Sequence, residues 1–189
     1  MMPSTGRRFA VAALVAAAVA TIAACQRASQ PPPSSAVISW TEVVDPEGHF
    51  RLLMPAGYRQ LAVPRPNGGT IHQFSAQVGS RFFDLTLTNY IGDEARRLKS
   101  PATLALALDQ MQAGMMRPWK DAVVVEQSPI QLGAVSGRAV LYSTDQGRML
   151  NFVRFYFPPD NIYMQAVRVP ATDRQDPDIA RFMESLRLQ

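Results

Sequence analysis

Groups suited to acid–base or metal chemistry are scarce in this chain. Its 189 residues include one cysteine, Cys25, and two histidines, His49 and His72. Histidine is the side chain whose ordinary pKa lets it act as a base near pH 7, and neither histidine has a recognisable nucleophile beside it in the sequence. No connected nucleophile–base pair or metal-binding pattern emerges. We therefore expect a protein that is not an enzyme and that needs no cofactor or metal.

The chain also has only a small excess of positive over negative charge. Nineteen lysines and arginines oppose fifteen acidic residues, which gives a net charge of +4. Arg7 and Arg8 supply two of these positive charges and lie directly before an apolar run. The remainder is close to neutral and shows no strong basic bias, so we expect no nucleic-acid partner.

The apolar run is too short for a typical membrane-spanning helix. Residues 9–24 carry no charge, but a helix that crosses a bilayer needs about 20 apolar residues. A short apolar run after two arginines is typical of a secretory signal peptide. The run ends in Ile22-Ala23-Ala24-Cys25, which resembles the lipobox of bacterial lipoproteins.

The lipobox resemblance implies a signal peptide at residues 1–24 and lipid attachment at Cys25. Cys25 would carry a diacylglycerol on its sulfur and a further acyl chain such as palmitate on its amine. Several acyl chains together give stable membrane anchoring, whereas one chain binds only weakly. The alternative is a buried or unpaired thiol, which an oxidising export compartment disfavours.

Residues 25–37 are expected to form a tether. They contain three consecutive prolines and no apolar periodicity, which favours an extended segment. Gln26 follows the lipidated cysteine, and a residue other than Asp at this position is typical of sorting to the outer membrane in enteric-type lipoproteins. We expect a cell-envelope protein, anchored in the outer membrane and facing the periplasm, with one globular domain at residues 38–189.

Strand patterns dominate that domain. Apolar alternation and turn residues predict strands at 36–44, 49–55, 70–78, 81–91, 122–132, 137–144, 149–158 and 162–169. Gly79-Ser80 predicts a tight hairpin turn. In the strand after it, Phe83, Leu85, Leu87 and Ile91 are expected to be buried, and Asp84, Thr86 and Thr88 to face a wetter side. The apolar residues at both parities of 151–157 predict a central strand covered on both faces.

Two segments predict helices. Ser100-Pro101 and Asp176-Pro177 each combine an N-cap residue with proline at the first helical position. Helical spacing groups two apolar stripes, one formed by Leu104, Leu108, Met111 and Met115, the other by Ile179, Phe182, Met183 and Leu186. Pro118 prevents the first helix from continuing.

Four stretches in this order resemble PsbP-like (Mog/PsbP-type) domains. They are HFRLLMPAGY, SPIQLGAVSGRAVLYS, NFVRFYFPPDNIYMQAVRV and RFMESLRL. The resemblance implies an α+β fold in which an antiparallel sheet is flanked by helices, an α/β/α sandwich. Members of this family are mostly binding or assembly modules, so the resemblance implies a non-catalytic role, although a fold alone does not fix a function.

Three sequence patterns resemble catalytic or metal-binding motifs. Gly133-Ala134-Val135-Ser136-Gly137 has the wrong spacing for a nucleophile elbow and predicts a hairpin turn instead. Asp45, Glu47 and His49 could form a loose metal site, but a turn at the surface is favoured. Met111, Met115 and Met116 could bind Cu(I), yet their helical stripe favours the core.

A basic cluster before the first helix, Arg96, Arg97 and Lys99, lies beside Asp93 and Glu94. A solvated loop is the simpler interpretation, and a docking patch for phosphate or lipid headgroups is the alternative. Taken together, the sequence predicts a membrane-anchored lipoprotein that binds a protein partner or assists envelope assembly. A carrier of a small apolar ligand is the second hypothesis, and an enzyme or metal-binding protein is the third.

Replacing Cys25 with alanine tests the anchor. Because the thiol is the acceptor for the diacylglycerol, we expect Cys25→Ala to leave the precursor unlipidated and uncleaved. Mass spectrometry of the membrane-extracted protein measures both modifications. An unmodified Cys25 in the mature wild-type protein would contradict the lipobox interpretation.

Overall fold

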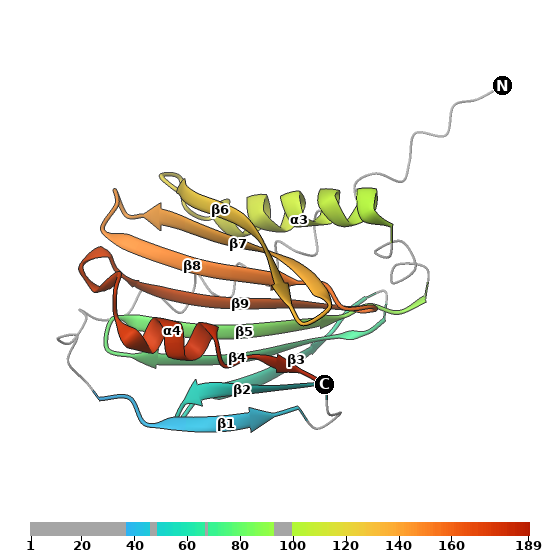
Figure 1. The fold of residues 1–189 in the computed structure, drawn as a ribbon, viewed down its shortest axis with the longest axis horizontal. Helices are drawn as coiled ribbons and strands as arrows, with labels where there is room; N and C mark the ends of the chain where they lie inside the picture. Colours follow the sequence, from blue (N-terminus) through green and yellow to red (C-terminus); the bar gives the residue numbers. More distant parts are fainter. Residues whose placement is uncertain (1–36, 46–48, 67, 93–99) are drawn as a thin grey trace.

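Two antiparallel sheets form the framework of the domain (Figure 1). The computed structural model describes residues 37–45, 49–66, 68–92 and 100–189. The larger sheet has seven strands in the spatial order β3 (Arg59–Pro64), β4 (Thr70–Val78), β5 (Arg81–Asn89), β9 (Asn161–Pro170), β8 (Met149–Tyr156), β7 (Val135–Thr144) and β6 (Val123–Leu132). The smaller sheet has three, in the order β1 (Trp40–Val44), β2 (Phe50–Pro55) and β10 (Arg187–Leu188).

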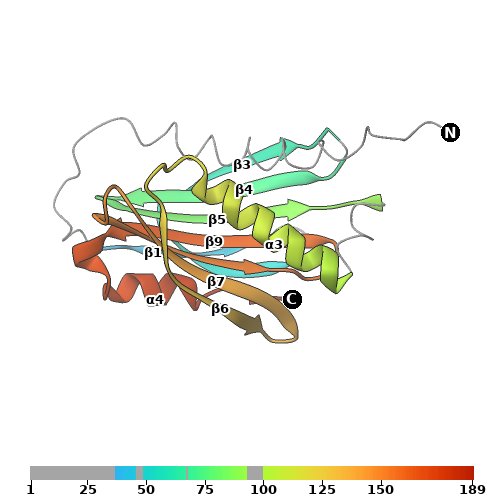
Figure 2. The ribbon, with the colours of Figure 1, turned by 90° about the horizontal axis from the view of Figure 1, so that it is seen from above.

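Helices cover both faces of the larger sheet. Helix α3 (Pro101–Met116) lies across one face, whereas α4 (Pro177–Met183) and the smaller sheet lie on the other (Figures 1 and 2). A 3₁₀ turn, η2 (Ala171–Asp173), connects β9 to α4. The predicted α+β fold with an antiparallel sheet between helices is therefore confirmed.

The main core lies between the larger sheet, the smaller sheet and α4. Aromatic rings join these layers edge to face, including Phe50 with Tyr163 and Phe83 with Phe182. Phe50, Phe83 and Phe182 are each fully buried. Edge-to-face pairs of this kind add about 0.5–1.5 kcal/mol beyond the burial of apolar area, so the aromatic rings fix how the three layers stack.

A second core lies beneath α3. Its buried residues are Met115, Val140, Tyr142, Val153 and Phe155. Strand β8 serves both cores, because Leu150 and Tyr156 face the main core while Val153 and Phe155 face α3. The prediction of a central strand covered on both faces is confirmed.

The β4–β5 hairpin follows the predicted turn at Gly79-Ser80, with Val78 opposite Arg81. The expectation that β5 has one buried face and one solvent-facing side is only half right. Leu85 and Leu87 are buried as predicted, but Asp84 and Thr86 on the opposite face are buried too. Ile91 lies beyond the end of β5 and is 54% exposed, so its predicted burial is wrong.

The sequence patterns missed β3, whose side chains are all exposed. An edge strand without a buried face lacks the alternation on which the prediction depends. The two-residue strand β10 was not predicted either, and the boundaries of the remaining strands agree with prediction within a few residues. The predicted turn between β1 and β2 falls mostly on residues 46–48, outside the described residues.

Both predicted helices form, with different N-terminal caps. Asp176 accepts a hydrogen bond from the Asp178 backbone N–H at 2.9 Å, whereas the side chain of Ser100 makes no capping bond. The stripe of α4 is buried, although Leu186 lies beyond the helix end. Among the described residues, no helix is both long and apolar enough to cross a membrane.

Substitution of Met115 and of Met111 tests whether these side chains serve core packing or copper binding. Met115 is 5% exposed, whereas Met111 is only partly buried. We expect Met115→Ala to lower the free energy of unfolding by about 2–5 kcal/mol, because it leaves a cavity. Met111→Ala should cost clearly less, because solvent reaches that site. Urea unfolding measures both values, and tight Cu(I) binding by the wild-type protein would instead support a ligand role.

Candidate binding groove

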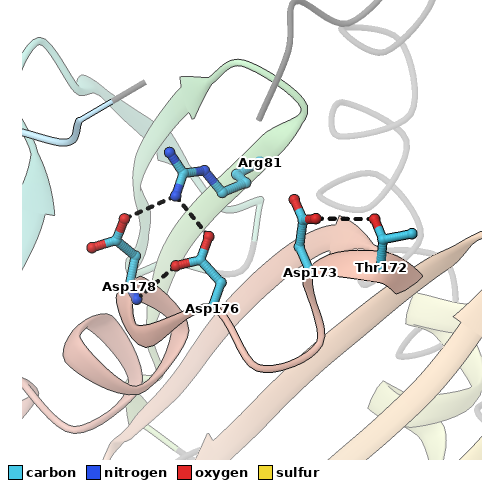
Figure 3. A network of polar contacts seen from close by, with 5 residues as sticks. All are labelled: Arg81, Thr172, Asp173, Asp176 and Asp178. Atoms are coloured by element: carbon cyan, nitrogen blue, oxygen red, sulfur yellow. Dashed lines mark hydrogen bonds and ion pairs between the residues drawn. The ribbon is translucent and has the colours of Figure 1, made fainter. Parts of the chain in front are cut away.

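Helix α4 is fixed to the larger sheet by an ion-pair network at its N-terminus (Figure 3). Nη1 of Arg81, from β5, lies 2.7 Å from Oδ2 of Asp176 and 2.8 Å from Oδ2 of Asp178. The Arg81 side chain is only 4% exposed. Removing one partner of a buried ion pair leaves an uncompensated charge, which is strongly destabilising. The network therefore sets the position of the first turn of α4.

The C-terminal end of α4 is held by two other side chains of the sheet. Gln165 of β9 donates from Nε2 to the Phe182 carbonyl, and Arg154 of β8 donates from Nη1 to the Met183 carbonyl, each at 2.7 Å. These carbonyls belong to the last turn, where helix carbonyls lack partners within the helix. A cation there also interacts favourably with the helix dipole.

Between α4 and the β6–β7–β8 part of the sheet lies an open groove of about 640 Å³. Its floor includes Ala139, Leu141 and Phe152. Ile179 and Ala180 of α4 form part of one wall. Binding pockets for small molecules commonly have volumes of this size and a largely apolar lining with a few polar groups. The groove is the strongest candidate binding site in the described part of the chain.

Most ionised groups in the groove have partners within the protein. Glu126 Oε1 lies 2.6 Å from Nη2 of Arg174. Asp176 pairs with Arg81, and Arg154 donates to the Met183 carbonyl. The exposed Glu184 also lines the groove, and Arg81 is shared between Asp176 and Asp178. The groove therefore presents an apolar floor with a rim that carries charges of both signs.

The strand at one wall of the groove is also an edge of the larger sheet. Most side chains of β6 are exposed, and Val123, Val124 and Val125 are 60%, 40% and 45% exposed. The register with β7 shifts between Val124 and Glu126, as at a β-bulge. Bulges and a proline, here Pro129, are devices that limit pairing of edge strands. Val124 lies opposite Tyr142 of the second core, so its side chain is on the α3 face of the sheet, away from the groove.

Of the predicted metal-site residues, the structure brings together Asp45 and His49. His49 Nδ1 lies 2.7 Å from Asp45 Oδ2, and the buried Asp45 carboxylate also accepts the His49 backbone N–H at 3.2 Å. Glu47 is outside the described residues. His72 lies in β4, opposite Leu87 and Ala62. No three His, Cys, Asp or Glu side chains gather as a potential metal site within the described ranges.

The predicted hairpin around Gly133 is confirmed. Gly133 has a φ of +60° between β6 and β7, a left-handed conformation that favours glycine. A Cβ at Gly137 would lie 2.2 Å from the Phe155 carbonyl oxygen, so the strands approach too closely for a side chain there. Ser136 is exposed in β7 and is followed by strand, not by the helix that a nucleophile elbow requires.

The other predicted residues separate into two groups. Met115 and the partly buried Met111 and Met116 pack in the second core, which agrees with their core interpretation. Cys25 and the basic cluster, with its acidic neighbours, lie outside the described residues. Lipid attachment at Cys25 stays a prediction.

Asp84 is the titratable group that the sequence patterns placed wrongly. It is fully buried on the face of β5 opposite Leu85, and it accepts hydrogen bonds from Gln73 Nε2 at 2.7 Å and Thr86 Oγ1 at 2.9 Å. Burial raises the pKa of the Asp84 carboxyl to about 6, and the two hydrogen bonds oppose this shift. In the hairpin, Gln73 lies opposite Thr86 and Ser75 lies opposite Asp84. Polar residues facing one another in this way do not distinguish a buried cluster from a solvent-exposed face.

Comparison with known proteins supports the fold. No protein-family model matches the chain, and no curated protein matches it in sequence. The solution structure of cyanobacterial PsbP (CyanoP) from Synechocystis sp. PCC 6803 is similar, with a TM-score of 0.54 and 10% identity, over 85% of this chain and 98% of that chain. This likeness confirms a PsbP-like fold and, at such low identity, shows the fold alone.

Two further structures have lower similarity. A crystal structure of PA94 from Pseudomonas aeruginosa, described as a protein of unknown function and putative regulator, has a TM-score of 0.43 and 13% identity, over 75% of this chain and 90% of that chain. The Ran-binding protein Mog1p of Saccharomyces cerevisiae has a TM-score of 0.44 and 10% identity, over 80% and 96% respectively.

The buried carboxyl of Asp84 predicts a pH-dependent stability. Its pKa in the folded state, about 6, exceeds the ordinary value of 3.8, so the folded state binds this proton more tightly than the unfolded state. The contribution is therefore favourable below about pH 4 and is lost as the pH rises through 6. At about 1.4 kcal/mol per pKa unit, Asp84→Asn should stabilise the protein by on the order of 2–3 kcal/mol at pH 7.5.

Urea unfolding at pH 4.5 and pH 7.5 measures this effect. Asp109→Asn is the matched control, because the Asp109 side chain is 65% exposed. The gain in Asp84→Asn should shrink at pH 4.5, while the control should change little at either pH. An Asp84→Asn protein that is less stable than wild type at pH 7.5 would contradict the assignment.

Proposed function

We propose that this chain is a lipid-anchored periplasmic protein whose PsbP-like domain binds another protein of the cell envelope without catalysis. In this proposal Cys25 carries the anchor in the outer membrane, residues 26–37 form the tether, and the groove beside α4 receives the partner. The observation that carries the binding role is the groove itself, with its apolar floor and a rim that carries charges of both signs.

The arrangement of charges supports binding over catalysis. A general acid or base needs an ionisable group that can reach a substrate and exchange a proton with it. The Glu126 and Asp176 carboxylates of the groove instead accept from arginines at 2.6 and 2.7 Å. Arg154 is committed to a helix carbonyl. These groups shape and fix the groove, which suits a site for recognition.

A carrier of a small apolar ligand is the second candidate. The apolar floor and the volume of about 640 Å³ favour it. The groove is open to solvent, however, whereas a carrier is expected to enclose its small ligand. Native mass spectrometry of the membrane-extracted protein separates the two functions, since a carrier should retain a discrete small ligand.

Photocrosslinking in cells tests the partner. A photoreactive side chain at Ala180, exposed on the α4 wall of the groove, should give a discrete crosslinked protein. The same group at Leu61, 47% exposed on the opposite edge strand β3, should not. Ala139→Trp fills the floor of the groove and should abolish the Ala180 crosslink, because the partner can no longer enter.

Three results would contradict the proposal. They are equal crosslinking from both positions, an Ala180 crosslink that survives Ala139→Trp, and no crosslink at Ala180 in a protein of normal abundance. Circular dichroism of the purified variants establishes that each one is folded.

A further inference from the structure

The Glu126–Arg174 ion pair joins the two walls of the groove. Glu126 belongs to β6, the edge strand, and Arg174 belongs to the connection between η2 and α4. Glu126 Oε1 and Arg174 Nη2 are 2.6 Å apart, and both residues line the groove. The pair therefore bridges the groove from the sheet side to the helix side.

We propose that this ion pair is a strap that controls access to the groove, and that the groove accepts an uncharged segment of the partner when the strap opens. The inference rests on the proposed function, because it specifies how the same groove is used.

Both ends of the strap lie next to an irregular position of the backbone. Glu126 follows the register shift in β6, so the neighbouring Val125 has no partner in the β6–β7 ladder. Arg174 lies between two short helical elements instead of within one. The side chains are 65% and 50% exposed. Exposed pairs of this kind are weak and are screened by salt, so the strap can open without disturbing the core.

The charges of the groove indicate what it admits. Glu126 is the only charged residue of β6, and the strap neutralises it. Asp176 shares Arg81 with Asp178 behind the wall, and Arg154 and Glu184 add one charge of each sign to the lining. A charged segment of either sign would gain little here and would lose its hydration, because the groove carries charges of both signs. Uncharged side chains suit the floor formed by Leu141 and Phe152.

Thiol labelling of the groove floor tests the strap without any partner. Ala139→Cys places a thiol on the half-buried floor of the full-length protein in detergent. A neutral maleimide reports access, and peptide mass spectrometry reads residue 139 separately from Cys25. Glu126→Gln breaks the ion pair with little change of shape, and we expect it to raise the labelling rate about 2–5-fold, the range that an exposed pair can supply.

Matched controls separate the strap from a general loss of charge. Asp109→Asn removes one negative charge from a carboxylate with the same 65% exposure, paired with Arg138 instead of across this groove, and it should leave the rate unchanged. The swapped pair Glu126→Arg with Arg174→Glu should restore slow labelling. Concentrated NaCl should accelerate the wild-type protein but not Glu126→Gln.

Equal labelling rates in wild type and Glu126→Gln would overturn the strap, and so would equal acceleration by Asp109→Asn. Hydrogen exchange of residues 171–183 is a second readout that needs no cysteine, and Glu126→Gln should raise it. Failure of these experiments leaves the Ala180 crosslink unaffected, whereas loss of that crosslink with a working strap would overturn the proposed partner instead.

Discussion

The buried contact between Arg81 and the first turn of α4 is the constraint on which the candidate groove depends. One guanidinium from β5 holds Asp176, which caps the helix, and Asp178, which lies in its first turn. A seven-residue helix has little stability of its own, because isolated short helices are marginal in water. Contacts with the larger sheet therefore stabilise the helical conformation of α4. The groove wall is as well defined as the sheet that anchors it.

Local sequence signals predicted the helix and strands that form the groove, but they did not predict that α4 lies close to β6. Asp176-Pro177 and the stripe of Ile179, Phe182 and Met183 identified α4, and the Gly133 turn identified the β6–β7 hairpin. Each signal is confined to a few neighbouring residues. The approach of α4 to β6 depends on strand order, to which residues far apart in the chain contribute. The Arg81 and Glu126 ion pairs were therefore invisible in the sequence.

The sequence also did not predict which side chains are buried on the second face of the larger sheet. Alternation correctly placed Leu85 and Leu87 inside, and the same rule placed Asp84 and Thr86 outside, where the structure buries both. Alternation distinguishes the two faces of a strand, but it does not say whether the second face is covered. Strand β3 was not predicted for the opposite reason, because it has no buried face and therefore no apolar alternation. The fold class survived these errors because it rests on the order of many elements.

The pairing of β10 with β2 brings the two ends of the domain into one small sheet, with Arg187 opposite Arg51. Chain order then imposes an order of assembly. The smaller sheet cannot be completed until Arg187 and Leu188 have been synthesised, so β1 and β2 form an incomplete pair until then. Contacts between such distant residues are slow to form, and incomplete edges are prone to wrong pairing. A chain that stops before Arg187 would remain at this unfinished stage.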